Sequence, residues 1–337
     1  MSKQFTIRPL GFPWETRDPF IFCVHHRDEF PKGNENMGPA VSLSGRNIGS
    51  DFAVKDGWRM YHGQQIPGFP YHPHRGFETV TVVKEGVVDH TDSMGASGRF
   101  SSGDVQWMTA GKGVLHSEMF PLLKEEEENP MELFQIWLNL PKVSKFVEPH
   151  FKMLWNEQIP KFQYKDSNDK QTTIDVIAGE VSAVKSPDST PSSWAADRNH
   201  HVAIWTIKME AGAEWLLPAS VEGVNRTLYY YKGEGLTIEN NAIPDYHSIQ
   251  VNPTDELTLK AGKEDCYLLL LQGEPINEPV VQHGPFVMNT EQEIQDAFHE
   301  YRQTQFGGWP WPNQEQVHPR NVGRFAKHAD GREETMD

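Results

Sequence analysis

Short apolar and β-branched runs alternate with turn residues through the first 150 positions. Segments of four to eight residues rich in Val, Thr and aromatic side chains, bounded by Gly and polar residues, are typical of strands. The clearest of these runs are Thr79–Val83, Val87–His90 and Val105–Thr109, with turns at Glu85-Gly86 and Ser93–Gly98. The close spacing predicts an all-β barrel or sandwich in this half of the chain.

A second series of the same kind lies between His201 and Gln272. Its runs are Val202–Met209, Thr227–Tyr231, Leu236–Glu239, Ser248–Val251, Glu256–Leu259 and Tyr267–Leu271. The glycines of Lys232-Gly233-Glu234-Gly235 supply one of the turns. The pattern therefore predicts a second β domain.

The boundary between the two β domains is predicted near residue 150. Pro141, Pro149 and Pro160 are spaced along this stretch, and residues 176–180 (VIAGE) already resemble a strand. We expect a first barrel over residues 1–150 and a second over 151–289. Residues 183–199, rich in Ser, Pro and Asp, are expected to form an exposed loop.

Residues 290–337 are predicted to be a helix followed by an extended tail. Thr290 and Glu293 form a capping-box pattern, and the apolar residues that follow recur at helical spacing until Gly307-Gly308. The tail carries Trp309-Pro310-Trp311-Pro312. We expect its two Trp side chains to pack within the molecule or a dimer; docking of a partner is the alternative.

Composition and charge narrow the class of protein. The chain has 337 residues, enough for two domains, and 47 acidic against 31 basic residues give a net charge of -16. Such a charge repels phosphate backbones and anionic lipids, so we expect no direct nucleic-acid or membrane binding. No run approaches a membrane span, the start lacks a secretory pattern, and the two cysteines suit a reducing compartment, so a cytoplasmic protein is expected.

Two pairs of polar residues at strand spacing point to a metal site. His72 and His74 stand at the entry to one β run, and His116 and Glu118 follow about forty residues later. Alternate residues of a strand project to the same side, roughly 6.6 Å apart. A single histidine in such a run is usually a hydrogen-bonded strand residue, but two pairs in neighbouring segments predict that four side chains converge on one ion.

Three imidazoles and one carboxylate favour a first-row transition metal over calcium or magnesium. Iron is the preferred ion, with Cu, Ni, Mn and Zn as alternatives. A closed structural zinc site would more often use Cys. Six-coordinate ions would keep two positions open for water, substrate or dioxygen.

Three blocks of the chain resemble signature stretches of the pirin family. They are HPHRGFETVT at 72–81, GDVQWMTAGKGVLHSEM at 103–119 and PVVQHGPFVMNT at 279–290. The resemblance implies a bicupin: two jelly-roll-like β-barrels packed together, with a metal only in the first. It also implies the ligand set His72, His74, His116 and Glu118.

Glu78 and residues 24–67 lie outside this ligand set but close to it in the sequence. Glu78 stands four residues after His74, where many cupins carry a carboxylate ligand, and a regular strand would point it inward with the histidines. The resemblance assigns the ligand role to Glu118, which leaves Glu78 as a supporting residue behind the ligands. Residues 24–67 are longer than expected for a pirin, and an insertion there could cover the mouth of the site.

The resemblance implies a quercetin 2,3-dioxygenase, which opens a flavonol with dioxygen and releases carbon monoxide. Glu118 would be the base for the flavonol hydroxyl, and Phe69, Gln135 and Trp137 are candidates to line the pocket for this small aromatic substrate. The alternative is a metal-dependent redox-sensing regulator that acts by binding a partner protein. A third hypothesis is a metal-stabilised scaffold without turnover.

Overall fold

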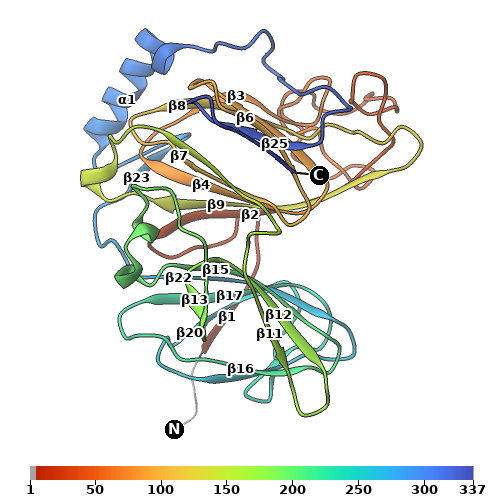
Figure 1. Cartoon of the computed structure of the whole chain (residues 1–337), viewed down its shortest axis with the longest axis vertical. Helices are drawn as coiled ribbons and strands as arrows, with labels where there is room; N and C mark the ends of the chain where they lie inside the picture. The colour runs from red at the N-terminus through yellow and green to blue at the C-terminus, as the bar shows by residue number, and fades with distance from the viewer. Residues whose placement is uncertain (1–4, 337) are drawn as a thin grey trace. The chain divides into compact units, whose positions relative to one another are not determined.

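The computed structural model describes residues 5–336 and divides them into two compact β units (Figure 1). Unit A consists of Val24–Asn156 and the segment that begins at Glu278. Unit B consists of the chain up to Cys23 and of Glu157–Asn277. The prediction of an all-β chain with one helix near its end is confirmed. No helix in the described part of the chain is long and apolar enough to cross a membrane.

The units are not the continuous segments that the sequence pattern suggested. β1 (Phe5–Pro9) pairs antiparallel with β20 (His247–Val251), and β25 (Arg324–Lys327) pairs antiparallel with β6 (Ser97–Ser101). These pairings join each end of the chain to strands far away in sequence, and backbone pairing of this kind leaves no local signature. The break between Asn156 and Glu157 does lie in the proline-spaced stretch.

Unit A is built from two antiparallel sheets that face each other (Figure 1). One sheet has the order β10 (His150–Leu154), β7 (Val105–Thr109), β4 (Phe77–Glu85), β9 (Asn129–Asn139), β2 (Phe20–Phe30). The other has the order β26 (Glu333–Met336), β25, β6, β5 (Val87–Asp92), β8 (Val114–Met119), β3 (Gly68–His74). Alternate residues of every strand point between the sheets, where the site described below lies.

The helix of unit A packs against its own small hairpin. α1 (Glu291–Thr304) begins at Thr290, whose hydroxyl accepts a hydrogen bond from the Glu293 amide. Its apolar face covers β24 (Phe286–Met288), which pairs with β23 (Val281–His283). Short 3-10 turns complete the unit at η1 (Lys142–Ser144) and η4 (Gln305–Gly307). The capping-box prediction is confirmed.

Unit B also contains two sheets around a dense apolar core. The larger sheet has the order β1, β20, β17 (Asn225–Lys232), β22 (Cys266–Gly273), β15 (Ala203–Met209), β12 (Gln171–Ala178), β11 (Lys161–Lys165). The smaller has the order β16 (Glu214–Leu217), β21 (Leu257–Lys260), β18 (Thr237–Ile238), β19 (Asn241–Ala242). Outside them lie the ribbon β13 (Glu180–Val181) and β14 (Val184–Lys185), with η2 (Trp194–Ala196) and η3 (Arg198–His200) in the expected loop region. Most of the buried side chains of the core are Leu, Ile, Val and Trp, together with Tyr230 and Cys266.

Candidate metal centre

Two neighbouring strands bring three histidines together in unit A. β3 and β8 run antiparallel with His72 directly opposite His116, and His74 lies one pleat further along β3. A register shift between Phe69 and His72 lets the preceding residues bend without disturbing this pairing. His74 and His116 are buried and His72 is half-buried. The predicted H-x-H pair and the histidine of the H-x-E pair therefore face the same interior.

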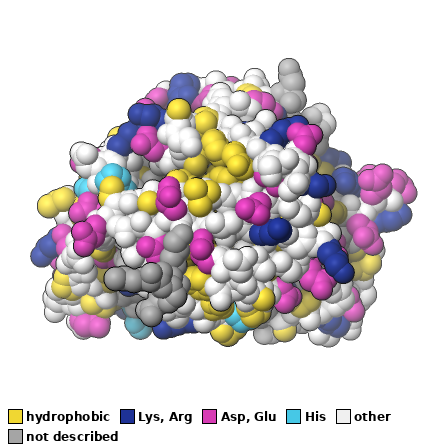
Figure 2. All heavy atoms as spheres, turned by 90° about the horizontal axis from the view of Figure 1, so that it is seen from below, with side chains coloured by type: hydrophobic (Ala, Val, Ile, Leu, Met, Phe, Trp, Pro, Cys, Tyr) yellow, Lys and Arg dark blue, Asp and Glu magenta, His cyan; other side chains and the backbone are white. Residues whose placement is uncertain are grey.

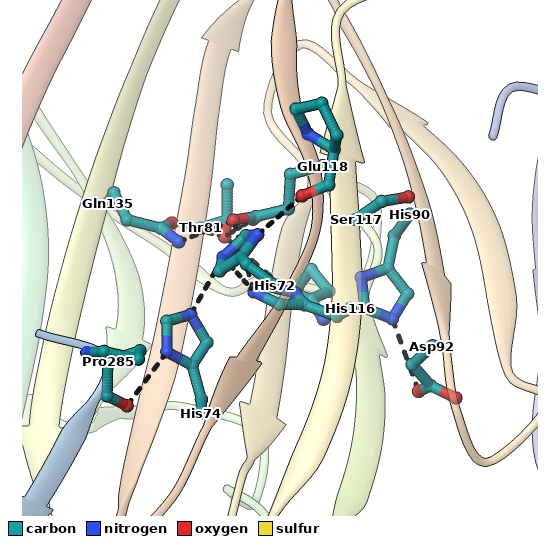
Figure 3. A network of polar contacts seen from close by, with 12 residues as sticks. His72, His74, Thr81, His90, Asp92, His116, Ser117, Glu118, Gln135 and Pro285 are labelled. Atoms are coloured by element: carbon teal, nitrogen blue, oxygen red, sulfur yellow. Dashed lines mark hydrogen bonds and ion pairs between the residues drawn. The ribbon is translucent and has the colours of Figure 1, made fainter. Parts of the chain in front are cut away.

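The ring nitrogens of the three histidines converge through their Nε2 atoms (Figure 3). Nε2 of His72 lies 3.1 Å from Nε2 of His74 and 3.0 Å from Nε2 of His116. Nδ1 of His72 donates to the Pro70 carbonyl oxygen at 2.9 Å, and Nδ1 of His74 donates to the Pro285 carbonyl oxygen at 3.3 Å. Because a carbonyl oxygen only accepts, it places the proton on Nδ1 and leaves the Nε2 lone pair facing inward.

This donor set fits a first-row transition ion. Metal–imidazole bonds are about 2.0–2.1 Å long, so two ligands at a right angle are separated by about 3.0 Å. Burial lowers the pKa of His72 to about 4, and burial together with the neighbouring imidazoles holds the pKa values of His74 and His116 well below the usual range. The rings are therefore neutral at pH 7, which is the form that binds metals.

Glu118 lies at the edge of the three imidazoles and closes a ring of hydrogen bonds. Its Oε2 is 3.8 Å from Nε2 of His116 and 2.9 Å from the amide nitrogen of Gln135, while its Oε1 is 2.9 Å from the Thr81 hydroxyl. The Thr81 hydroxyl is also 2.6 Å from the amide oxygen of Gln135. Burial raises the pKa of Glu118.

A neutral Glu118 carboxyl supplies a proton for each of the three contacts among Glu118, Thr81 and Gln135. Glu118 then donates to Thr81, Thr81 donates to the Gln135 oxygen, and the Gln135 amide donates back to Glu118. With an ionised carboxylate the single hydroxyl proton of Thr81 cannot serve both neighbouring oxygens. The arrangement thus accommodates a proton on Glu118, beside the Nε2 atoms.

The other predicted pocket residues lie around this group. The Phe69 ring centroid is 6.3 Å from that of His72, and the Trp137 ring centroid is 5.4 Å from that of His74. Phe69 also contacts Phe52, Tyr61 and His62, so part of segment 24–67 covers Phe69 beside the histidines. The tail adds further cover near β3, because Trp309 stacks on Tyr71 with ring centroids 5.0 Å apart.

Glu78 does not face the histidines. A tight turn at Gly76, with φ +86, separates β3 from β4, so the strand parity counted from His74 is lost. On β4 it is Thr81 that points to Glu118, and the even-numbered Glu78 lies on the opposite face, where it accepts a hydrogen bond of 2.7 Å from Thr109. The expectation of an inward Glu78 assumed an unbroken strand.

A third pair, His90 and Asp92, was not singled out from the sequence. These residues lie on β5 directly opposite Glu118 and His116 of β8, and the His90 ring centroid is 5.5 Å from that of His116. Nε2 of His90 lies 3.4 Å from the Asp92 carboxylate, whereas Nδ1 of His90 and Nδ1 of His116 are buried without a partner in the described structure (Figure 3). The signal available was an H-x-D pair at strand spacing, like the other two pairs.

Comparison with known proteins places the chain in a family. The pirin family model matches residues 12–138, and the model of the pirin C-terminal cupin domain matches residues 204–307. The chain is 37% identical over 244 residues to Pirin-1 of Arabidopsis thaliana, covering 71% of this chain and 78% of that protein. It belongs to the pirin family.

Other pirins and one solved structure agree with this placement. Human pirin is 36% identical over 254 residues, which cover 73% of this chain and 80% of human pirin. The crystal structure of a quercetin 2,3-dioxygenase from Acinetobacter baumannii matches with a TM-score of 0.70 and 27% identity, over 91% of this chain and 99% of that one. The predicted two-cupin architecture of this pirin is confirmed.

Proposed function

We propose that this pirin is a metal-dependent dioxygenase that opens flavonols such as quercetin with dioxygen. The observation that carries the proposal is the convergence of three neutral imidazoles, two of them with Nε2 lone pairs fixed by backbone carbonyls, beside a buried carboxyl group. His72, His74 and His116 would hold the metal, most suitably iron, and Glu118 would complete the ligand set. The likeness to a solved quercetin 2,3-dioxygenase supports this choice of reaction.

A bound divalent ion would act as a Lewis acid toward the flavonol 3-hydroxyl and, if redox-active, would assist its reaction with triplet dioxygen. The chain's own contribution begins with orientation. The Pro70 and Pro285 carbonyls hold two imidazoles in one tautomer and one direction, so their lone pairs need no rearrangement. Phe69 and Trp137 offer apolar ring surface on two sides for a planar substrate.

Glu118 is proposed to accept the proton of the flavonol 3-hydroxyl. The burial that raises its pKa makes it a stronger base than an exposed carboxylate. Once protonated, the carboxyl donates to Thr81 and accepts from the Gln135 amide, so the proton is held in a fully hydrogen-bonded ring. The same ring can return the proton when the ring-opened acid leaves.

The test is turnover together with metal content. Iron-loaded protein should consume oxygen and release carbon monoxide in the presence of quercetin, and His72→Ala should lose both metal and turnover. His299→Ala, on the exposed part of α1, is the matched control and should keep both. Equal turnover in His72→Ala and the parent would refute the proposal; bound metal without any turnover would favour the redox-sensing regulator that binds a partner protein.

A further inference from the structure

One buried arginine of unit B has no carboxylate partner. Arg59, Arg75 and Arg99 of unit A are also buried, and each forms an ion pair, with Asp28 at 2.9 Å, Glu300 at 2.8 Å and Asp89 at 2.7 Å. Arg226 is only 2% exposed, yet no acidic side chain of the described chain forms an ion pair with it. A buried charge without a counterion is strongly unfavourable, so such a group is expected to meet an anion.

The hydrogen bonds of Arg226 are also incomplete. Its Nη1 donates to the Pro218 carbonyl oxygen at 2.7 Å, but its Nε is buried without an acceptor in the described structure. Two neighbours are in the same condition: the indole nitrogen of Trp205, whose ring lies 5.9 Å from the guanidinium carbon, and the amide oxygen of Gln272. Gln272 is directly opposite Arg226 in the β17–β22 pair. Two unpartnered donors, Nε of Arg226 and the Trp205 indole nitrogen, therefore lie near one unpartnered acceptor, the Gln272 amide oxygen.

Arg226 lines a groove in unit B that solvent can enter. The groove has a volume of about 1030 Å³. Its wall combines apolar side chains from Phe5, Ile7 and Val224 with the second cation, Arg17. Burial lowers the pKa of Arg226 to about 10, which still leaves it charged at pH 7. Figure 2 shows acidic and basic side chains intermixed over one face of the molecule, whereas the lining of the groove contains two arginines and no acidic residue, in a chain of net charge -16.

We propose that unit B binds a small organic carboxylate with an apolar body in this groove. The planar guanidinium of Arg226 matches a carboxylate through two parallel hydrogen bonds, and Phe5, Ile7 and Val224 cover the apolar part. This site is separate from the three histidines and requires no metal.

The first experiment compares benzoate with its neutral isostere benzamide by isothermal titration calorimetry on the full chain. Benzoate should bind with one-to-one stoichiometry, and benzamide and inorganic phosphate should each bind at least tenfold more weakly. Arg226→Met should lower benzoate affinity at least tenfold. The benzoate affinity of Arg226→Lys should lie between that of Arg226→Met and that of the parent. Lys260→Met removes an exposed cation of the same unit and should leave affinity unchanged. Equal affinity for benzoate and benzamide, or no benzoate binding by the parent, would overturn the proposal.

A second variant tests whether Arg226 lacks a counterion while keeping Arg226 in place. Gln272→Glu keeps the size of the side chain and places a carboxylate opposite Arg226, so it should supply the missing counterion within the chain, in exchange for the hydrogen bond that the Gln272 amide donates to the His201 carbonyl. We expect its thermal midpoint to rise and benzoate binding to drop at least tenfold. A lower midpoint with undiminished benzoate binding would show that Arg226 does not await an anion. Because this variant is predicted to be more stable than the parent, the outcome does not depend on how Arg226→Met folds.

Discussion

Replacing Thr81 by Val removes one hydroxyl from the ring around Glu118 and changes little else. Thr81 is 1% exposed, and its hydroxyl meets Glu118 at 2.9 Å and Gln135 at 2.6 Å. Loss of two hydrogen bonds, each worth about 1 kcal/mol, and the burial of an unpaired amide oxygen should lower the free energy of unfolding by about 2–3 kcal/mol. If Glu118 transfers the proton, kcat for quercetin should also fall at least tenfold, with KM nearly unchanged.

Thr79→Val is the matched control. Thr79 lies two residues earlier on the same face of β4, and its hydroxyl is buried without a partner in the described structure. Removal of a hydroxyl that forms no hydrogen bond should leave stability unchanged or raise it by about 1 kcal/mol. Urea unfolding measures the stabilities, and oxygen consumption measures turnover. Equal stability of the two variants would refute the hydrogen-bonded ring, and an unchanged kcat in Thr81→Val would refute its part in proton transfer.

Three further substitutions test other parts of the chain. Glu118→Gln keeps the shape of the side chain and can still donate to Thr81 and accept from Gln135, so stability should change by less than about 1 kcal/mol, while loss of the proton-accepting carboxylate should lower turnover with quercetin at least 100-fold. Burial lowers the pKa of His26 to about 3, so below pH 6.5 the unfolded chain takes up a proton that the folded chain does not, and the protein loses stability as the pH is lowered. His26→Gln should therefore reduce the loss of stability between pH 6.5 and 5 by about 2 kcal/mol in urea unfolding, whereas His299→Gln should leave that loss unchanged. Gly76→Ala should cost more than about 3 kcal/mol, since its Cβ would lie 2.0 Å from a backbone carbonyl oxygen, and Gly95→Ala, with a similar φ of +87 in open space, should cost far less.

The local pattern of the sequence was sufficient for the strands and for the three histidines. H-x-H and H-x-E at a spacing of two need only a regular strand to face one side, and β3 and β8 are regular at these residues. The same argument predicted the wrong direction for Glu78. The turn at Gly76 separates β3 from β4, so the alternation of side chains along β3 does not continue into β4. His90 and Asp92 had the right spacing but were recognisable only once β5 was known to lie beside β8.

The sequence could not predict which distant segments supply hydrogen-bond and strand-pairing partners. The carbonyl of Pro285 orients His74 from 211 residues away, and a carbonyl oxygen carries no residue-type signature. The same holds for the pairing of β25 with β6, which depends on backbone atoms alone. The sequence also gives no sign that Arg226 lacks an ion pair, because a buried arginine is ordinarily expected to pair with an acidic residue.

The discontinuous make-up of unit A sets an order for biosynthesis. A ribosome delivers β6 early, but β25 and Pro285 emerge only after all of unit B has been made. Unit B has its full set of strands by Asn277 and can fold while the last strands are still being translated. Until then, the nascent sheet of β6, β5, β8 and β3 has an unpaired edge at β6, and His74 acquires its orienting carbonyl only in the final stage of synthesis.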